Sequence, residues 1–239
     1  MKLSLIVPCY NEEKGIENLH SQLNPVLESL SKDWELELIF VDDGSKDRTL
    51  ELLNHYFGKK SYVKIVPHEI NKNLGAAMRT GFAQATGDII VTMDSDCTYD
   101  PKNIPKMLKV LDEDTDMVTA SPYHPLGNNN IPKHRLFLSK SITGIYCLLT
   151  GSRIYTFTAL FRAYKKEVIQ NVAFKSDDFL ATAEILILAL NKGYKVREYP
   201  TTLNTRAFGD SKIRMLKVIK SHFLFASGLL FLKLFKKKK

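Results

Sequence analysis

The sequence predicts an α/β fold, in which helices flank a mostly parallel central sheet, followed by an amphipathic C-terminal helix. Short apolar runs alternate with segments of helical spacing, as they do in doubly wound sheets. From Ile213 onward, apolar and aromatic residues are mixed with lysines. With 239 residues, 44% of them hydrophobic, the chain can bury one full core. We therefore expect one α/β domain at residues 1–212 and a tail at residues 213–239.

Five buried strands are expected in the first half of the chain, each a short apolar run bounded by polar or turn residues. They cover residues 3–7, 36–41, 63–66, 89–93 and 117–120. The helices expected between them cover residues 12–30, 49–57, 75–85 and 104–111. Pro25 should kink or divide the first of these helices, because proline lacks the N–H that a helix interior needs.

A segment rich in proline, glycine and asparagine interrupts the alternation at residues 122–132. It predicts a surface loop of the kind that shapes or gates a ligand site. Beyond it, helices are expected at residues 135–149 and 178–191, and strands at residues 155–164 and 195–199.

Charge and cysteine usage exclude several classes of protein. The net charge is +8, but Lys233 and residues 236–239 supply much of it, and no basic stripe interleaved with aromatics is evident. We therefore expect no nucleic-acid partner. The three cysteines are widely separated and have no metal-site spacing, which suggests a reducing compartment. The chain begins directly with a predicted strand, so we expect a cytoplasmic protein.

The tail predicts a helix that lies on a membrane surface. Its apolar stretch, Phe223–Leu232, is about half of the ~20 residues that a transmembrane helix needs. Apolar side chains can enter the acyl boundary while the terminal lysines attract anionic lipid headgroups. We therefore expect a peripheral protein on the inner face of a membrane, with an anionic membrane surface as partner. The alternative is a helix packed on the body or a surface for self-association.

Two carboxylates, Asp94 and Asp96, follow the strand predicted at residues 89–93. Alternation along an extended chain would put them on the same side, and ligands of open α/β sheets bind beyond the carboxyl ends of the strands. Carboxylates and substrate phosphates are the ligands that Mg²⁺ prefers, and Mn²⁺ shares that preference for oxygen. The pair predicts a divalent metal site; the alternative is a solvated loop or a helix cap before Pro101.

Two other predicted strands end in polar residues at the same edge. Asp42 and Asp43 follow the strand at residues 36–41, and one of them could hold a ribose or a base. The alternative for this segment is capping and turn chemistry for the next helix. The first strand leads into Pro8, Tyr10 and Glu12, which offer an aromatic face and hydrogen-bond acceptors. A structured turn before a helix is the alternative there.

Several motifs together resemble the family 2 glycosyltransferases, and within them the dolichol-phosphate mannosyltransferase and polyprenyl-phosphate glycosyltransferase group. The resemblance spans residues 3 to about 212. The matching stretches are Ile6–Glu12, Val41–Ser45, Asn73–Gly75, Arg79–Gly81, Ala85–Asp88, Asp94–Asp96, Arg206 and Gly209–Lys212.

This resemblance implies a GT-A fold and assigns roles to residues. Asp94 and Asp96 would hold Mg²⁺ or Mn²⁺ on the donor diphosphate and, with Arg206, form the catalytic set. The positions implied to bind the nucleotide-sugar donor are Pro8, Tyr10, Asn11, Glu12, Asp43, Asn73, Gly75, Arg79, Asp94 and Ser95. The positions implied to bind the acceptor phosphate are Arg206, Ser211 and Lys212. A solvated basic loop is the alternative for this last group.

Relatives often carry Ser-Arg-Tyr where this chain has Ser121-Pro122-Tyr123, and a different polar side chain at Thr98. The candidate replacements for the missing arginine are Arg135, Arg153 and Arg162. Glu184 matches an acidic position near the family's active site, or else is a buried, hydrogen-bonded carboxylate.

The resemblance implies an inverting hexosyltransferase of cell-envelope glycan synthesis. It would move a hexose from GDP-mannose or a UDP-sugar to a polyprenyl or dolichyl phosphate. A phosphate oxygen is already a competent nucleophile, whereas a sugar hydroxyl would need a base, for which Asp177 and Asp178 are the candidates. The alternatives are a transferase that extends a lipid- or protein-linked glycan, and a nucleotide-binding membrane-docking module without turnover. A dehydrogenase is disfavoured because no GxGxxG follows the first strand.

Overall fold

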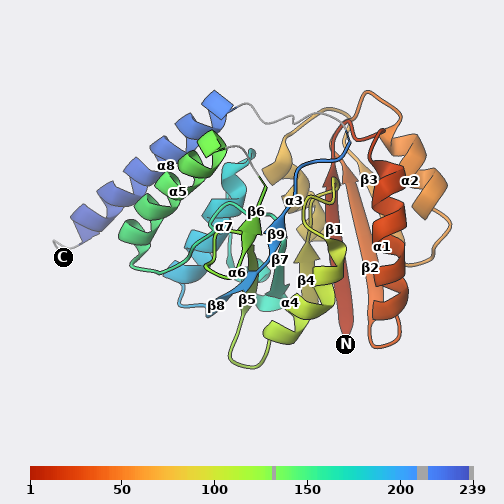
Figure 1. Cartoon of the computed structure of the whole chain (residues 1–239), viewed down its shortest axis with the longest axis horizontal. Coiled ribbons are helices and arrows are strands. Elements are labelled where there is room, and N and C mark those ends of the chain that lie inside the picture. Colours follow the sequence, from red (N-terminus) through yellow and green to blue (C-terminus); the bar gives the residue numbers. More distant parts are fainter. Residues whose placement is uncertain (131–132, 209–214, 237–239) are drawn as a thin grey trace.

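A seven-stranded sheet forms the centre of the part that the computed structural model describes, residues 1–130, 133–208 and 215–236 (Figure 1). The strand order is β3-β2-β1-β4-β7-β5-β8. The strands are β1 (Lys2–Cys9), β2 (Glu35–Asp42), β3 (Val63–Pro67), β4 (Ile89–Thr92), β5 (Met117–Ser121), β7 (Arg162–Lys165) and β8 (Val196–Pro200). β7 runs antiparallel to β4 and β5, and the other pairings are parallel. The predicted mostly parallel sheet is confirmed.

Helices cover both faces of the sheet, as the alternating pattern predicts. They are α1 (Ile16–Leu30), α2 (Thr49–Phe57), α3 (Leu74–Gln84), α4 (Ile104–Val110), α5 (Lys133–Thr150), α6 (Lys166–Asn171), α7 (Leu180–Asn191) and α8 (Met215–Lys236), with a 3₁₀ turn η1 (Pro101–Asn103) before α4. Pro25 does not divide α1, which is assigned as one continuous helix. Its buried face, with Leu19 and Leu23 before the proline and Leu27 and Leu30 after it, packs both halves into the same core.

The strand expected at residues 155–164 is much shorter than predicted, because only Arg162–Lys165 pair with neighbouring strands. The segment before it is apolar and mostly buried, but it runs as irregular chain. The carboxylate of Glu198 on β8 accepts the backbone N–H groups of Tyr155 and Thr156 at 2.9–3.0 Å. The Glu198 side chain thus satisfies backbone N–H groups that would otherwise need hydrogen bonds to a neighbouring strand.

The loop expected at residues 122–132 contains a short strand. Within it, β6 (Asn128–Asn129) pairs in parallel with β9 (Thr202–Leu203), which directly follows β8. This small sheet joins the loop after β5 to the segment that carries Arg206. Two distant parts of the sequence therefore meet above the same edge of the main sheet.

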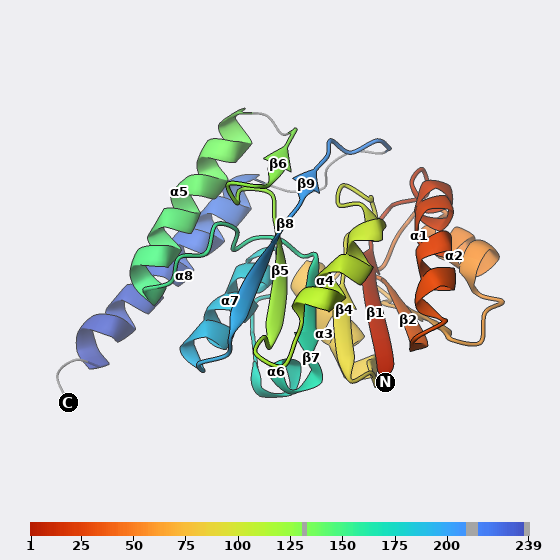
Figure 2. The ribbon, with the colours of Figure 1, turned by 60° about the horizontal axis from the view of Figure 1, so that its bottom comes forward.

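The C-terminal helix α8 lies beside α5 in both ribbon views and also contacts α7 (Figures 1 and 2). Ala226 is buried, and the buried ring of His222 pairs through Nδ1 with the Tyr146 hydroxyl at 2.7 Å. The packed-helix alternative therefore describes one face of α8. In the described part of the chain, no helix combines the length and apolar character needed to cross a bilayer.

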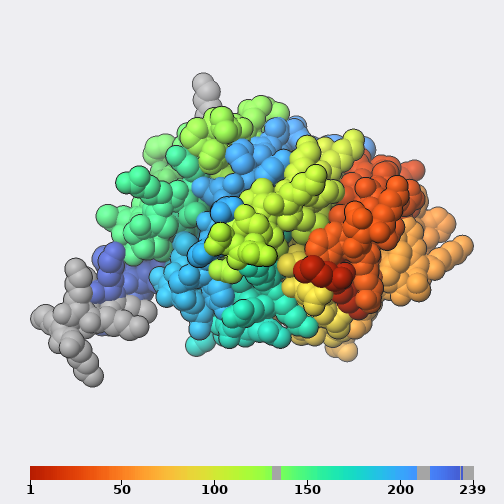
Figure 3. Space-filling view, turned by 90° about the horizontal axis from the view of Figure 1, so that it is seen from below, coloured from red at the N-terminus to blue at the C-terminus, as the bar shows by residue number. Residues whose placement is uncertain are grey.

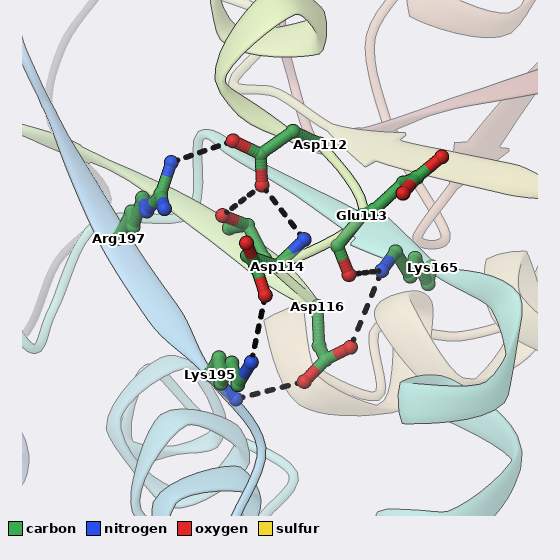
Figure 4. Close-up of polar contacts among 8 residues, drawn as sticks. Asp112, Glu113, Asp114, Asp116, Lys165, Lys195 and Arg197 are labelled. Atoms are coloured by element: carbon green, nitrogen blue, oxygen red, sulfur yellow. Dashed lines mark hydrogen bonds and ion pairs between the residues drawn. The ribbon is translucent and has the colours of Figure 1, made fainter.

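A group of charged residues joins the starts of β5 and β8 to the end of β7, on the edge where β1 begins (Figure 4). The residues are Asp112, Glu113, Asp114, Asp116, Lys165, Lys195 and Arg197, and we call them the edge cluster. Figure 3 looks onto this edge from below and shows the yellow-green segment that includes the loop before β5.

Candidate active site

The carboxyl ends of β2, β1 and β4 are neighbours in the sheet and bring three predicted polar segments together. The parallel register pairs Cys9 of β1 with Asp42 of β2, and the Asp43 N–H donates to the Cys9 carbonyl at 2.8 Å. On the other side, the Met93 N–H donates to the Ile6 carbonyl at 3.1 Å. Since adjacent parallel strands end at one edge, the residues that follow them share one site.

A cavity of about 1060 Å³ opens at this edge, large enough for a nucleotide-sized ligand. Ten of the positions implied for donor or catalysis line it. They are Pro8, Tyr10, Asn11, Glu12, Asp43, Asn73, Asp94, Ser95, Asp96 and Arg206. Ser211 and Lys212 fall outside the described residues, so their predicted role in phosphate binding stays a prediction.

Asp94 and Asp96 reach the cavity in a different way from the one predicted. β4 ends at Thr92, so both carboxylates lie beyond the strand, and Ser95 and Asp96 form a turn. Cys97 has a positive φ of 54°, which bends the chain directly after Asp96. Asp96 Oδ1 accepts the Thr98 N–H at 3.0 Å and its hydroxyl at 2.9 Å. A local turn, fixed by Thr98, brings the two carboxylates together.

The environment of Asp94 fits a cation. Its side chain is half-buried, but the Oδ2 atom is buried and has no hydrogen-bond partner among the described residues. Burial, and then the neighbouring charge of Asp96, raise the pKa of Asp94 to about 8. An unpartnered buried carboxylate oxygen is costly unless a ligand completes it. No group of three acidic, histidine or cysteine ligands occurs in the described ranges, so two carboxylates would leave coordination positions for substrate oxygens.

Arg206 crosses from the segment after β9 into the acidic part of the cavity. Its guanidinium hydrogen-bonds the buried carboxylate of Glu12, and Nη1 lies 3.8 Å from Asp96 Oδ2. Nε donates to the Phe208 carbonyl at 2.6 Å, which orients the group. The predicted phosphate-binding arginine thus lies beside the predicted metal ligands and the predicted donor pocket.

A chain of contacts that the sequence interpretation missed holds Asp43. His68 Nδ1 lies 2.7 Å from Asp43 Oδ1, and His68 Nε2 lies 2.9 Å from the Thr80 hydroxyl. Asn71 donates to Asp43 Oδ2 at 2.9 Å, and the Lys72 N–H donates to Oδ1 at 2.9 Å. The sequence did contain a signal for His68, because this residue directly follows β3, the strand next to β2 in the sheet.

Asn11 and Ser45 fasten the first two strand ends to each other. The Asn11 N–H donates to the Ser45 hydroxyl at 2.9 Å, and Asn11 Oδ1 accepts the Lys46 N–H at 2.8 Å. Asn11 has a φ of 52°, a left-handed conformation that asparagine tolerates better than most residues. Besides lining the cavity, Asn11 therefore shapes the loop that presents Tyr10 and Glu12.

Two positions implied to bind the donor, Gly75 and Arg79, do not line the cavity. A Cβ on Gly75 would lie 2.1 Å from the Ser176 carbonyl oxygen, so this glycine allows α3 to approach the loop before α7. Arg79 donates to the same carbonyl at 2.9 Å and pairs with Asp177. Packing and polar contacts between α3 and the loop before α7 explain both residues.

The structure separates the two candidate bases. Asp178 lines the cavity, whereas Asp177 is exposed and pairs with Arg79. Glu184 is buried and accepts the N–H groups of Lys175 and Ser176 at 3.1 and 2.8 Å, as the structural alternative predicts.

Of the three candidate arginines, Arg162 and Arg153 are described by the structure, and neither lines the cavity. Arg162 is fully buried and donates to Thr119 Oγ1 at 3.1 Å and to the Phe157 carbonyl at 2.6 Å, so it stabilises the core. Arg153 is exposed and lies outside the lining, and the side chain of Arg135 is outside the described residues.

The fold and the site define an open α/β-sheet protein with an acidic cavity beyond the carboxyl ends of its central strands. The sequence pattern described as Glycosyl transferase family 2 matches residues 4–173. The chain belongs to this family, and the resemblance found in its motifs is confirmed.

Two relatives show the similarity in sequence. A dolichol-phosphate mannosyltransferase from Pyrococcus furiosus is 35% identical over 90% of this chain. An undecaprenyl-phosphate 4-deoxy-4-formamido-L-arabinose transferase from Salmonella choleraesuis is 31% identical over 91% of this chain. The matches cover 60% and 64% of those proteins, so the chain spans less than two thirds of the relatives' length.

Solved structures with a similar fold include glucosyl-3-phosphoglycerate synthase from Mycobacterium tuberculosis. Its complex with Mn²⁺, UDP and glucosyl-3-phosphoglycerate matches 95% of this chain and 80% of that chain, with a TM-score of 0.71 and 19% identity. Its complex with Mg²⁺ and UDP matches with a TM-score of 0.72 and 18% identity. At this identity the similarity establishes the fold.

Proposed function

We propose that the protein is an inverting glycosyltransferase that moves a hexose from a nucleotide sugar, GDP-mannose or a UDP-sugar, to a polyprenyl or dolichyl phosphate. The observation that carries this proposal is the cavity, in which Asp94 and Asp96 lie beside Arg206 at the end of the central strands. The relatives named for transfer to dolichol phosphate and undecaprenyl phosphate support the acceptor class.

Asp94 and Asp96 would hold Mg²⁺ or Mn²⁺, which when bound would neutralise charge on the donor diphosphate. The orphaned Asp94 oxygen supports this assignment. Tyr10 and Asp43 line the part of the cavity formed by β1 and β2, where they would orient the base and ribose. His68 and Asn71 would keep the Asp43 carboxylate in one orientation.

The reaction is a single displacement at C1 of the hexose. An oxygen of the acceptor phosphate forms the new bond to C1, and the bond from C1 to the nucleoside diphosphate breaks on the opposite side. Configuration therefore inverts, and no proton has to be removed from the nucleophile. Arg206 would hold phosphate oxygens through charge-assisted hydrogen bonds, and alignment would supply much of the rate.

Extension of a lipid- or protein-linked glycan is a second candidate, favoured by the place of Asp178 in the cavity lining. A hydroxyl acceptor would need a base, and Asp178 is the candidate base that lines the cavity. The two candidates therefore differ in whether turnover depends on Asp178 as a proton acceptor.

The outer face of α8 supports a peripheral position on an anionic membrane surface. Leu216, Phe223, Leu224 and Phe231 are exposed on the helix whose inner face packs on α5 and α7. Replacing Phe223 and Leu224 with serine should lower sedimentation with anionic vesicles while leaving donor binding unchanged. Equal sedimentation of the double variant and the wild type would contradict this placement.

The function is tested by release of nucleoside diphosphate from a panel of GDP- and UDP-sugars with Mn²⁺. Each donor is assayed alone, with farnesyl phosphate, and with a glycan acceptor. Release that requires farnesyl phosphate supports the proposal. Release only with the glycan supports chain extension, and metal-dependent nucleotide binding without turnover would identify a docking module.

A further inference from the structure

The first turn of α8 enters the cavity that holds the donor residues. Lys217 and Val218 line it together with Arg206 and Asp178. The tail was expected to lie on a membrane surface or to pack on the body, and its N-terminal end also lines this cavity. α8 therefore connects the exposed apolar surface of the molecule to the place where the acceptor must react.

Two contacts fix this end of α8 against the body. The Ser221 hydroxyl donates to Asp178 Oδ2 at 2.7 Å and also to the Lys217 carbonyl at 3.0 Å. One residue further on, the buried His222 ring pairs with Tyr146 at 2.7 Å. Because residues four apart share a helix face, Lys217 and Ser221 point to the same side of α8. The hydrogen bond from Ser221 to Asp178 therefore fixes the helical turn that carries Lys217.

Among the described residues that line the cavity, Arg206 and Lys217 are the cations. Arg206 is engaged by Glu12 and lies near Asp96, beside the predicted metal ligands. Lys217 forms no ion pair with any described residue and is exposed to solvent. A lysine ammonium is a flexible point charge well suited to bind a phosphate.

We propose that Lys217 binds the phosphate group of the acceptor and so selects phosphate-bearing acceptors over neutral ones. This inference rests on the proposed glycosyl transfer and names a residue for its second substrate. A lipid lying along the exposed Phe223 and Leu224 would bring its headgroup toward the N-terminal end of α8, where Lys217 lies. A phosphomonoester without a lipid tail would offer the same group from solution.

The test compares Lys217→Ala with Lys220→Ala, which removes the same charge one turn away. Lys220 is exposed on the same helix and does not line the cavity. Turnover is measured against farnesyl phosphate and, in a second arm, glycerol 3-phosphate, in detergent without vesicles. Lys217→Arg tests whether the positive charge is sufficient.

We expect Lys217→Ala to raise the KM for farnesyl phosphate at least fivefold, with the donor KM within twofold of wild type. Lys220→Ala and Lys217→Arg should stay within twofold for both substrates. A similar rise with glycerol 3-phosphate would place the effect on the phosphate itself, and a rise confined to farnesyl phosphate would place it on the lipid-borne phosphate. An equal rise in both alanine variants, an unchanged acceptor KM, or a raised donor KM would overturn the proposal.

Failure of the proposed function would be distinguishable from failure of this inference. A wild type that turns over no phosphate acceptor would overturn the function, and equilibrium binding of farnesyl phosphate to the wild type and Lys217→Ala would then test the lysine. A Kd that differs at least fivefold supports the site, and equal values overturn it.

Discussion

Two groups of aspartates lie at opposite edges of the same sheet and have opposite surroundings. In the edge cluster, Asp112 pairs with Arg197 at 2.7 Å and Asp114 pairs with Lys195 at 3.0 Å, in contact with solvent. In the cavity, the Oδ2 atom of Asp94 is buried and has no partner among the described residues. Basic side chains of the protein neutralise the first group, whereas in the second group the Asp94 Oδ2 atom is left for a ligand.

The pKa values follow the same division. The pKa of Asp112 is lowered, first by the hydroxyl of Thr115 and then by Arg197, so its charged form is favoured. Burial raises the pKa of Asp94 to about 8, so its charged form is disfavoured until a cation arrives. Both segments contain aspartates separated by one residue. Partners and burial, more than the spacing of the aspartates, therefore distinguish a candidate metal site from a surface network.

Replacing the cavity carboxylate should have the largest effect. Asp96→Ala is expected to lower turnover about 10²–10⁴-fold, because a ligand for the diphosphate-bound metal is lost. Asp114→Ala removes an aspartate of the edge cluster and should leave turnover within twofold. Nucleoside diphosphate release measures both. Similar losses in the two variants would contradict the division between the edges.

Addition of Mn²⁺ should raise the stability of the wild type and leave the stability of Asp94→Asn unchanged. At a Mn²⁺ concentration near 100 times Kd, binding to the folded state adds about 2.7 kcal/mol to the free energy of unfolding. Thermal unfolding with Mn²⁺ and with a chelator measures this shift in the wild type and in Asp94→Asn. A shift that persists in Asp94→Asn would place the metal elsewhere.

Without metal, Asp94→Asn should be more stable than the wild type by about 1–3 kcal/mol at pH 6. The pKa of Asp94 is about 8 in the folded state, above its unfolded value. The wild type therefore loses stability as the pH rises from about 4 to 8, a loss that the amide does not share. Denaturant unfolding at several pH values should show the difference growing across this window and levelling above it. A difference independent of pH would contradict the cause.

The smallest effect is expected in the edge cluster. Asp114→Ala should change the free energy of unfolding by less than about 1 kcal/mol, because Asp114 and Lys195 are exposed with side-chain accessibilities of 76% and 65%. The change should shrink further in high salt. Urea unfolding at low and high salt measures it, and a loss of several kcal/mol would show that the cluster stabilises the fold.

The sequence placed most of the sheet correctly because periodicity is a local property. The runs at residues 3–7, 36–41 and 117–120 fall inside β1, β2 and β5, and the helix at residues 49–57 is α2. The strand at residues 155–164 was overestimated, since its backbone is satisfied by Glu198, a partner more than forty residues away. Local pattern carries no information about such a partner.

In the site, too, some features followed from local sequence and others depended on distant partners. The strand-end rule was enough to bring Tyr10, Asp43 and Asp94 to one edge, because the order of the strands fixes where their ends meet. It gave no account of Gly75 and Arg79, whose surroundings are set by the loop before α7. It also missed His68, although that residue follows a strand at the same edge.

The sequence by itself determined the α/β class, the family and the acidic strand ends, because strand and helix periods and short motifs are written in consecutive residues. Tertiary structure decided that Arg206 lies beside Glu12 and Asp96. It also decided that Arg162 stabilises the core and that Lys217 of α8 lines the cavity. These outcomes depend on contacts between residues tens to nearly two hundred positions apart, which only packing brings together.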